Sequence, residues 1–163
     1  MKIENDIKFD FSDVLIRPKR TVLTSRSEVS LTRRFTFPNS TSTWEGVPII
    51  AANMDTTGTF NVMNVLSKHN MLTCLTKFYG PHDFKTPANM ENKWKHGIIS
   101  SGISDNDFTK LTEILTWRGD NMDSDNITWV CVDIANGYMQ KIVDFCKKVR
   151  SAFNNIVLIA GNV

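Results

Sequence analysis

The stretch ITWVCVDIANG, residues 127–137, is a run of apolar and β-branched residues that ends in aspartate, asparagine and glycine. PIIAANMDTTG at 48–58 and IVLIAGNV at 156–163 have the same form. Most such runs in this chain lack period-2 alternation, which is typical of strands buried on both faces, as in parallel sheets. The pattern therefore predicts buried parallel strands that each end in a cluster of polar and glycine residues.

Five apolar runs are spaced along the chain, and we expect a strand in each: 47–52, 71–76, 97–101, 128–134 and 156–160. Three segments between them have helical periodicity: 59–66, 107–115 and 138–153. In the last segment lysine and arginine lie opposite an apolar face formed by Met139, Ile142, Val143, Cys146, Val149 and Phe153. Alternating strands and helices predict βαβ units and a parallel sheet.

Two α/β architectures fit this alternation, an open doubly wound sheet and a closed barrel. The G-x-G-x-x-G fingerprint of the dinucleotide-binding open sheet is absent. Polar clusters at the carboxyl end of every strand favour a parallel (β/α)8 TIM barrel. A complete barrel needs about 250 residues, so we expect this chain to cover about the first five strands. We predict one domain, with an N-terminal arm at 1–46 and strand–helix units at 47–163.

Composition limits the class of protein. The 163 residues are 41% hydrophobic with a net charge of +2, which indicates a globular chain and gives no strong attraction to nucleic acid. No apolar run approaches the roughly 20 residues that span a bilayer. Cys74, Cys131 and Cys146 are odd in number and lie within apolar runs, so we expect buried thiols and a cytoplasmic protein.

Several long blocks carry a specific resemblance: DFSDVLIRPKRTVLTSRSEVSL (10–31), PIIAANMDTTGTF (48–60), HGIISSGIS (96–104), CVDIANGY (131–138) and LIAGNV (158–163). Together they resemble the inosine-monophosphate dehydrogenase and GMP reductase family, over residues 7–163. Ala51, Asn53–Asp55 and Ile134–Tyr138 are closer to the reductase branch. The regulatory domain that dehydrogenases commonly insert between the early strands is also absent.

The resemblance implies NADPH-dependent conversion of GMP to IMP and ammonia by a homotetramer. The family's nucleophilic cysteine lies in a G-x-G-S-x-C-x-T loop that also binds a monovalent cation, K⁺. These 163 residues do not contain that motif, so we expect no catalytic residue in this chain and place the nucleophile downstream of Val163. Two alternatives stay open: an inactive half-barrel that acts as a binding module, and an enzyme of the dehydrogenase type.

The resemblance also implies ligand-binding residues. For the cofactor they are Ser25, Arg26, Lys77, Asp133, Ile134 and Ala135. For the substrate we expect Asn53, Met54 and Asn162, because they lie at strand ends and their side chains suit a purine or a sugar. We expect no metal ligands, because His69, His82 and His96 share no metal-ligand spacing.

Five of these site residues also have a plainer interpretation. Asp133 is a candidate N-cap for the helix at 138–153, although Asn136 lies closer to it. Lys77 and Arg26 could be solvated surface charges. Met54 could be an ordinary core residue, and Asn162 a turn residue after Gly161.

Overall fold

The computed structural model describes residues 5–86, 94–121 and 128–162. The chain divides into two compact units, Met1–Ser30 and Leu31–Val163. In the first unit, two short 3-10 helices, Phe11–Asp13 and Arg26–Glu28, interrupt extended backbone. The side chains of Asp10 and Ser25 cap them by accepting hydrogen bonds from nearby backbone N–H groups.

The second unit begins with an antiparallel hairpin, β1 (Arg33–Phe37) and β2 (Ser40–Gly46). Phe35 and Trp44 are cross-strand partners, with ring centroids 5.9 Å apart. Sequence reasoning placed this segment in the arm and missed both strands. The first strand, RRFTF, is almost entirely exposed, so it lacks the continuous apolar run by which the other strands were found.

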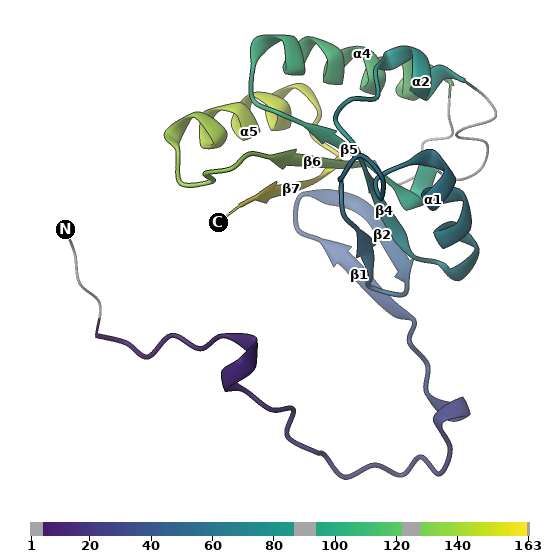
Figure 1. The fold of residues 1–163 in the computed structure, drawn as a ribbon. Coiled ribbons are helices and arrows are strands. Elements are labelled where there is room, and N and C mark those ends of the chain that lie inside the picture. Colours follow the sequence, from purple (N-terminus) through teal and green to yellow (C-terminus); the bar gives the residue numbers. More distant parts are fainter. Residues whose placement is uncertain (1–4, 87–93, 122–127, 163) are drawn as a thin grey trace. The chain divides into compact units, whose positions relative to one another are not determined.

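Five parallel strands form the main sheet, and they pair in chain order (Figure 1). They are β3 (Ile50–Ala51), β4 (Leu72–Leu75), β5 (Gly97–Ser101), β6 (Trp129–Asp133) and β7 (Val157–Gly161). Each lies within or one residue beyond a predicted run. Consecutive parallel pairing without a break in order is what successive βαβ units produce. The predicted strand directions are therefore confirmed.

The connections between these strands carry the helices α1 (Phe60–Leu66), α2 (Pro81–Lys85), α4 (Asp105–Asn121) and α5 (Gln140–Ala152). The helix predicted at 107–115 is longer than expected, and the short α2 was not predicted. α1 begins where the Thr59 hydroxyl accepts a hydrogen bond from the Val62 N–H. Figure 1 shows α4 and α5 lying over the sheet near β5 and β6.

The two faces of the sheet belong to two different hydrophobic clusters. On β6, Val130 and Val132 pack in the cluster that contains the helix residues, while Trp129 and Cys131 face the other cluster. This second cluster also includes Trp44 of the hairpin, whose ring meets that of Trp129 edge-on at 6.0 Å. Successive strand residues point to opposite faces, so one face is covered by helices and the opposite face contacts the hairpin.

The buried side of α5 differs from the predicted one. Ile142, Phe145 and Val149 are buried, whereas Met139 and Val143 are each 44% exposed. The alternative that Asp133 or Asn136 caps this helix is wrong, because the cap position is Met139 and no side chain bonds to it. Asn136 instead accepts a hydrogen bond from the Tyr138 N–H.

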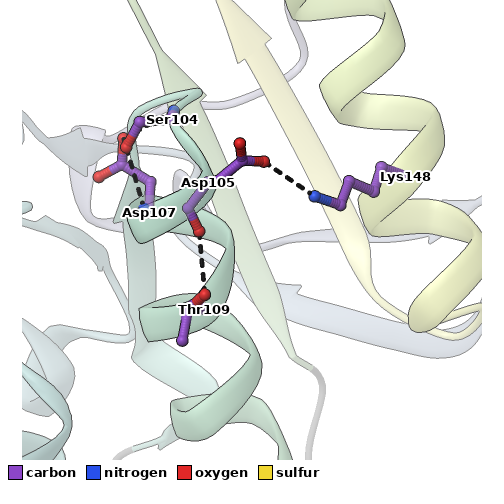
Figure 2. A network of polar contacts seen from close by, with 5 residues as sticks. All are labelled: Ser104, Asp105, Asp107, Thr109 and Lys148. Atoms are coloured by element: carbon purple, nitrogen blue, oxygen red, sulfur yellow. Dashed lines mark hydrogen bonds and ion pairs between the residues drawn. The ribbon is translucent and has the colours of Figure 1, made fainter.

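The first turn of α4 is fixed by a capping box, shown in Figure 2. The Ser104 hydroxyl accepts from the Asp107 N–H at 3.1 Å, and the Asp107 carboxylate accepts from the Ser104 N–H at 2.9 Å. In the same turn Asp105 forms an ion pair with Lys148 of α5 at 3.2 Å. The Lys148 ammonium also lies 4.0 Å from the centre of the Phe108 ring. These contacts tie α4 to α5.

Candidate functional site

The carboxyl ends of β3 and β6 are joined by a side-chain hydrogen bond. Asn53, just after β3, donates from Nδ2 to Oδ2 of Asp133, the last residue of β6, at 2.9 Å. β3 and β6 are three positions apart in the sheet, which is about 14 Å in a flat sheet. Two short side chains joined by a hydrogen bond of 2.9 Å are too short to bridge that distance. The sheet therefore curves toward its hairpin side, as in a barrel wall.

Asp133 lies on the hairpin side of β6, the inner face of the curved sheet, because it shares the face of Trp129 and Cys131. We call these three residues the inward row of β6. It is half-buried and its carboxylate has a defined partner in Asn53. Sequence reasoning proposed both residues for different ligands, and the structure brings them together. The direct contact between them was not predicted.

The loop after β6 is fastened to the end of β7. The Asn162 backbone N–H and its Nδ2 both donate to the Ile134 carbonyl, at 3.1 and 3.2 Å. The Gly137 N–H donates to the Asn162 carbonyl at 2.8 Å. Asn162 therefore holds the backbone of the Asp133–Gly137 loop in place, while its predicted substrate contact stays a prediction.

Three other predicted residues lie in the loops after their strands. Met54 is 63% exposed and belongs to neither hydrophobic cluster of the described residues. Ala135 is exposed, whereas Ile134 packs against the helix-side cluster. An exposed methionine beside a polar pair offers an apolar surface for a flat ring.

Lys77 is exposed in the loop after β4. Its ammonium lies 5.9 Å from the centre of the neighbouring Phe78 ring, and its carbonyl accepts a hydrogen bond from Lys110 of α4. Both lysines act electrostatically on Asp107. The loop after β4 and the first half of α4 thus contact each other in a region that contains two lysines and the carboxylate of Asp107.

Ser25 and Arg26 lie in the N-terminal unit. Ser25 Oγ accepts from the Ser27 N–H at 3.2 Å, and Arg26 begins the short helix that this bond caps. Both residues are exposed. Their predicted contact with the cofactor stays a prediction.

A layer of sulfur and hydroxyl groups lies next to Asp133 on the inward face. Cys74 of β4 contacts Ser100 of β5, with Sγ and Oγ 3.2 Å apart. Cys131 of β6 is the strand partner of Ser100 and lies in the same hydrophobic cluster as Cys74. The neighbouring thiol of Cys74 and burial raise the pKa of Cys131 above its ordinary value. The prediction of buried thiols holds for Cys74, whereas Cys131 and Cys146 are only partly buried. Sequence reasoning placed Ser100 in a polar cluster at the end of its strand but did not predict its contact with Cys74.

The described residues contain no cluster of three or more His, Cys, Asp or Glu side chains that could hold a metal ion. His96 is buried, its Nδ1 lies 3.1 Å from the Met71 carbonyl, and burial lowers its pKa. Within the same part of the chain no helix is long and apolar enough to cross a bilayer.

A family model described as the IMP dehydrogenase / GMP reductase domain matches residues 8–163. The chain belongs to this family. It is 47% identical over 165 residues to the GMP reductase of Shewanella halifaxensis, and 47% identical to that of Buchnera aphidicola subsp. Schizaphis graminum. Each match covers 100% of this chain and 46% of the relative. The chain therefore spans about half the length of these family members.

The barrel prediction is confirmed by a solved structure. The inosine 5′-monophosphate dehydrogenase of Legionella pneumophila matches 94% of this chain and 43% of its own, with a TM-score of 0.71. The sequence identity is 22%, so this likeness concerns the fold alone. Together with the five parallel strands, it shows a half-barrel of the family's TIM-barrel domain. Asn53 and Asp133 accordingly lie at the carboxyl rim, where barrel enzymes hold their active sites.

Proposed function

We propose that this chain provides the cofactor-binding part of a GMP reductase, which converts GMP to IMP and ammonia with NADPH. The observation that carries the proposal is the 47% identity to GMP reductases along the whole chain. The geometry supports it, because the polar residues of the match gather at the carboxyl rim of the half-barrel.

The rim residues fit the cofactor chemically. NADPH, when bound, supplies the hydride. Asp133 offers carboxylate oxygens to a ribose or carboxamide, and the neighbouring Ile134 and Ala135 offer backbone groups. Lys77 brings a point charge suited to phosphate. We assign Ser25 and Arg26 to the adenosine end, where an arginine fork suits a 2′-phosphate.

The same rim provides groups for the purine nucleotide. We assign Asn53, Met54 and Asn162 to the substrate side. Asn53 has a second task in the structure, because its amide N–H donates to Asp133 and holds that carboxylate in one orientation. Orientation of this kind lets a side chain bind its ligand without first being ordered.

The remaining parts of the mechanism belong outside residues 1–163. We assign the nucleophilic cysteine and the K⁺ site to the part of the family domain that this chain does not match. We further propose a cytoplasmic homotetramer. These assignments rest on family membership and on the absence of the G-x-G-S-x-C motif from the printed sequence.

The test is a chimera. Residues 1–163 are fused to the part of the Shewanella halifaxensis GMP reductase that the alignment does not cover, and NADPH consumption is followed with GMP as substrate. We expect NADPH-dependent formation of IMP and ammonia by the chimera, and none by residues 1–163 alone. Removing a covalent nucleophile costs several orders of magnitude in rate.

Variants of the chimera test the individual roles. Asp133→Ala should lower kcat by roughly 100-fold, the scale of a misplaced reacting group. Lys77→Ala should raise the KM for NADPH. Cys146→Ser, on α5 and away from the rim, serves as the control. NAD⁺-dependent oxidation of IMP without GMP reduction would instead support the dehydrogenase, and a folded chimera with neither activity would support the binding module.

A further inference from the structure

One lysine of α4 contacts the loop that carries Lys77 and has no part in the proposed chemistry. The Lys110 ammonium donates a hydrogen bond to the Lys77 carbonyl, across 33 positions of sequence. Lys110 lies on α4, and Lys77 lies two residues beyond the end of β4. The bond therefore ties the loop after β4 to the helix that follows β5.

Lys77 is a central residue of a tight turn. The Tyr79 N–H donates to the Thr76 carbonyl at 3.3 Å and closes this turn over residues 76–79. The closing bond uses the Thr76 carbonyl and leaves the Lys77 carbonyl available to a partner outside the turn. Lys110 is that partner.

The two ends of the turn are held by the core, but its tip is not. Thr76 is buried, and Tyr79 packs against the helix-side hydrophobic cluster. Lys77 and Phe78 between them are exposed. Burial therefore fixes the ends of the turn, and the position of its tip depends on the polar contact from Lys110.

Lys110 projects from a fixed part of α4. The capping box of Ser104 and Asp107 orders the first turn of this helix (Figure 2). Lys110 lies three residues beyond Asp107, on the same side of the helix. The positive charges of Lys110 and Lys77 both contribute to the lowered pKa of Asp107, which agrees with their position near this carboxylate. The anchor of the tip is thus itself well anchored.

We propose that Lys110 is a positioning residue for the cofactor, because its hydrogen bond holds the turn from which the Lys77 side chain reaches a phosphate group. The inference rests on the proposed function, in which Lys77 binds a phosphate of NADPH. The role of Lys110 differs from that of Lys77, since its ammonium is directed to a backbone carbonyl. Lysine is a point charge on a flexible stem. A fixed backbone beneath it reduces the ordering that binding must otherwise supply.

The first measurement is amide hydrogen exchange in the 163-residue chain. Lys110→Met keeps an unbranched stem but removes the donor. The Tyr79 N–H should exchange about 10-fold faster in this variant, the scale of one hydrogen bond to a charged group. Lys85→Met is the matched control, because Lys85 also contacts α4, but through the Glu113 carboxylate at 2.7 Å. It should leave the exchange of Tyr79 unchanged.

The second measurement uses the chimera described above. Lys110→Met should raise the KM for NADPH by about 10-fold and leave the KM for GMP unchanged. Lys110→Arg keeps an N–H donor and should return the KM for NADPH to within about threefold of the parent value. Lys85→Met should behave like the parent chimera. A general loss of stability would not separate the two substrates in this way.

The outcomes distinguish this inference from the proposed function. A parent chimera without GMP-dependent oxidation of NADPH would contradict the proposed function, and the exchange measurement would still decide whether Lys110 holds the turn. Unchanged exchange of Tyr79 in a folded Lys110→Met chain, verified by circular dichroism, would overturn the inference. Equal rises in the KM for NADPH and for GMP would also overturn it, as would a Lys110→Arg chimera as impaired as Lys110→Met.

Discussion

Replacing Asp107 by alanine should weaken the start of α4 measurably. The Asp107 carboxylate accepts hydrogen bonds from both the N–H and the hydroxyl of Ser104, at 2.9 and 2.6 Å (Figure 2). It also packs against the loop, because a Cβ added at Gly102 would meet Asp107 Oδ2 at 2.5 Å. The variant therefore loses two acceptor contacts and leaves a gap beside Gly102.

The expected loss is about 1 kcal/mol in the free energy of unfolding near neutral pH, the usual value of a helix cap. The sign of its pH dependence follows from the pKa of Asp107. Burial raises that pKa, but the hydrogen bonds from Ser104 and the charges of Lys110 and Lys77 outweigh it, so the pKa is lowered. Its stabilisation is present above the unfolded pKa of about 3.9 and is lost as the pH falls through the lower folded value.

The assay is urea unfolding followed by circular dichroism at about pH 7 and about pH 3, for the parent chain and Asp107→Ala. The difference between the two should shrink at the lower pH. Asp105→Ala is the matched control, since Asp105 lies in the same turn but its side chain is fully exposed in the ion pair with Lys148. An equal loss in both variants, or a loss for Asp107→Ala that is the same at both pH values, would refute the capping argument.

Two other substitutions test the core and the rim. Leu75→Ala, at a fully buried position on the helix side of β4, should lower the free energy of unfolding in urea by about 2–5 kcal/mol. A loss no larger than that of Val143→Ala, at a half-exposed position, would contradict the assigned core. Asn53→Asp would place a second carboxylate within hydrogen-bonding distance of Asp133. The variant should therefore be less stable than the parent chain at neutral pH, and the difference should shrink as the pH falls and one carboxyl takes up a proton. Urea unfolding at several pH values measures this, and an effect that does not depend on pH would argue against the contact.

The parallel sheet could be predicted because each strand is buried on both faces. In β6, Trp129 and Val130 are both buried although they face opposite sides, so the sequence reads as one continuous apolar run. The hairpin escaped prediction for the opposite reason, since β1 is exposed and its stability comes from the pairing of Phe35 with Trp44 across the turn. Such a cross-strand contact has no signature in a single run of residues.

The helix faces were predicted less well than the helices. In α5 the sequence has apolar residues on more than one side, and periodicity alone did not separate Val143, which is half-exposed, from Phe145, which is buried. Tertiary packing made that choice. Likewise α4 begins before the predicted segment because its capping box begins at Ser104, upstream of the first apolar residue, Phe108.

At the rim, sequence reasoning identified residue types at strand ends but not their contacts. Asn53 and Asp133 are 80 residues apart, and their hydrogen bond depends on the curvature of four strands. Asn162 shows the reverse case, because a side chain proposed for a ligand is used in the structure to hold the loop after Asp133. Curvature and loop contacts are set by the whole sheet, so no local pattern reports them.

One strand shows how the fold separates stability from chemistry. Val130 and Val132 of β6 face the helices in a fully buried cluster. Trp129, Cys131 and Asp133 alternate with them and change from aromatic to thiol to carboxylate toward the rim. Because the two rows pack in two different clusters, we expect substitutions in one row to alter the other little. The row that faces the hairpin can therefore vary from aromatic to carboxylate toward the end of the strand while the helix-side row keeps the half-barrel folded.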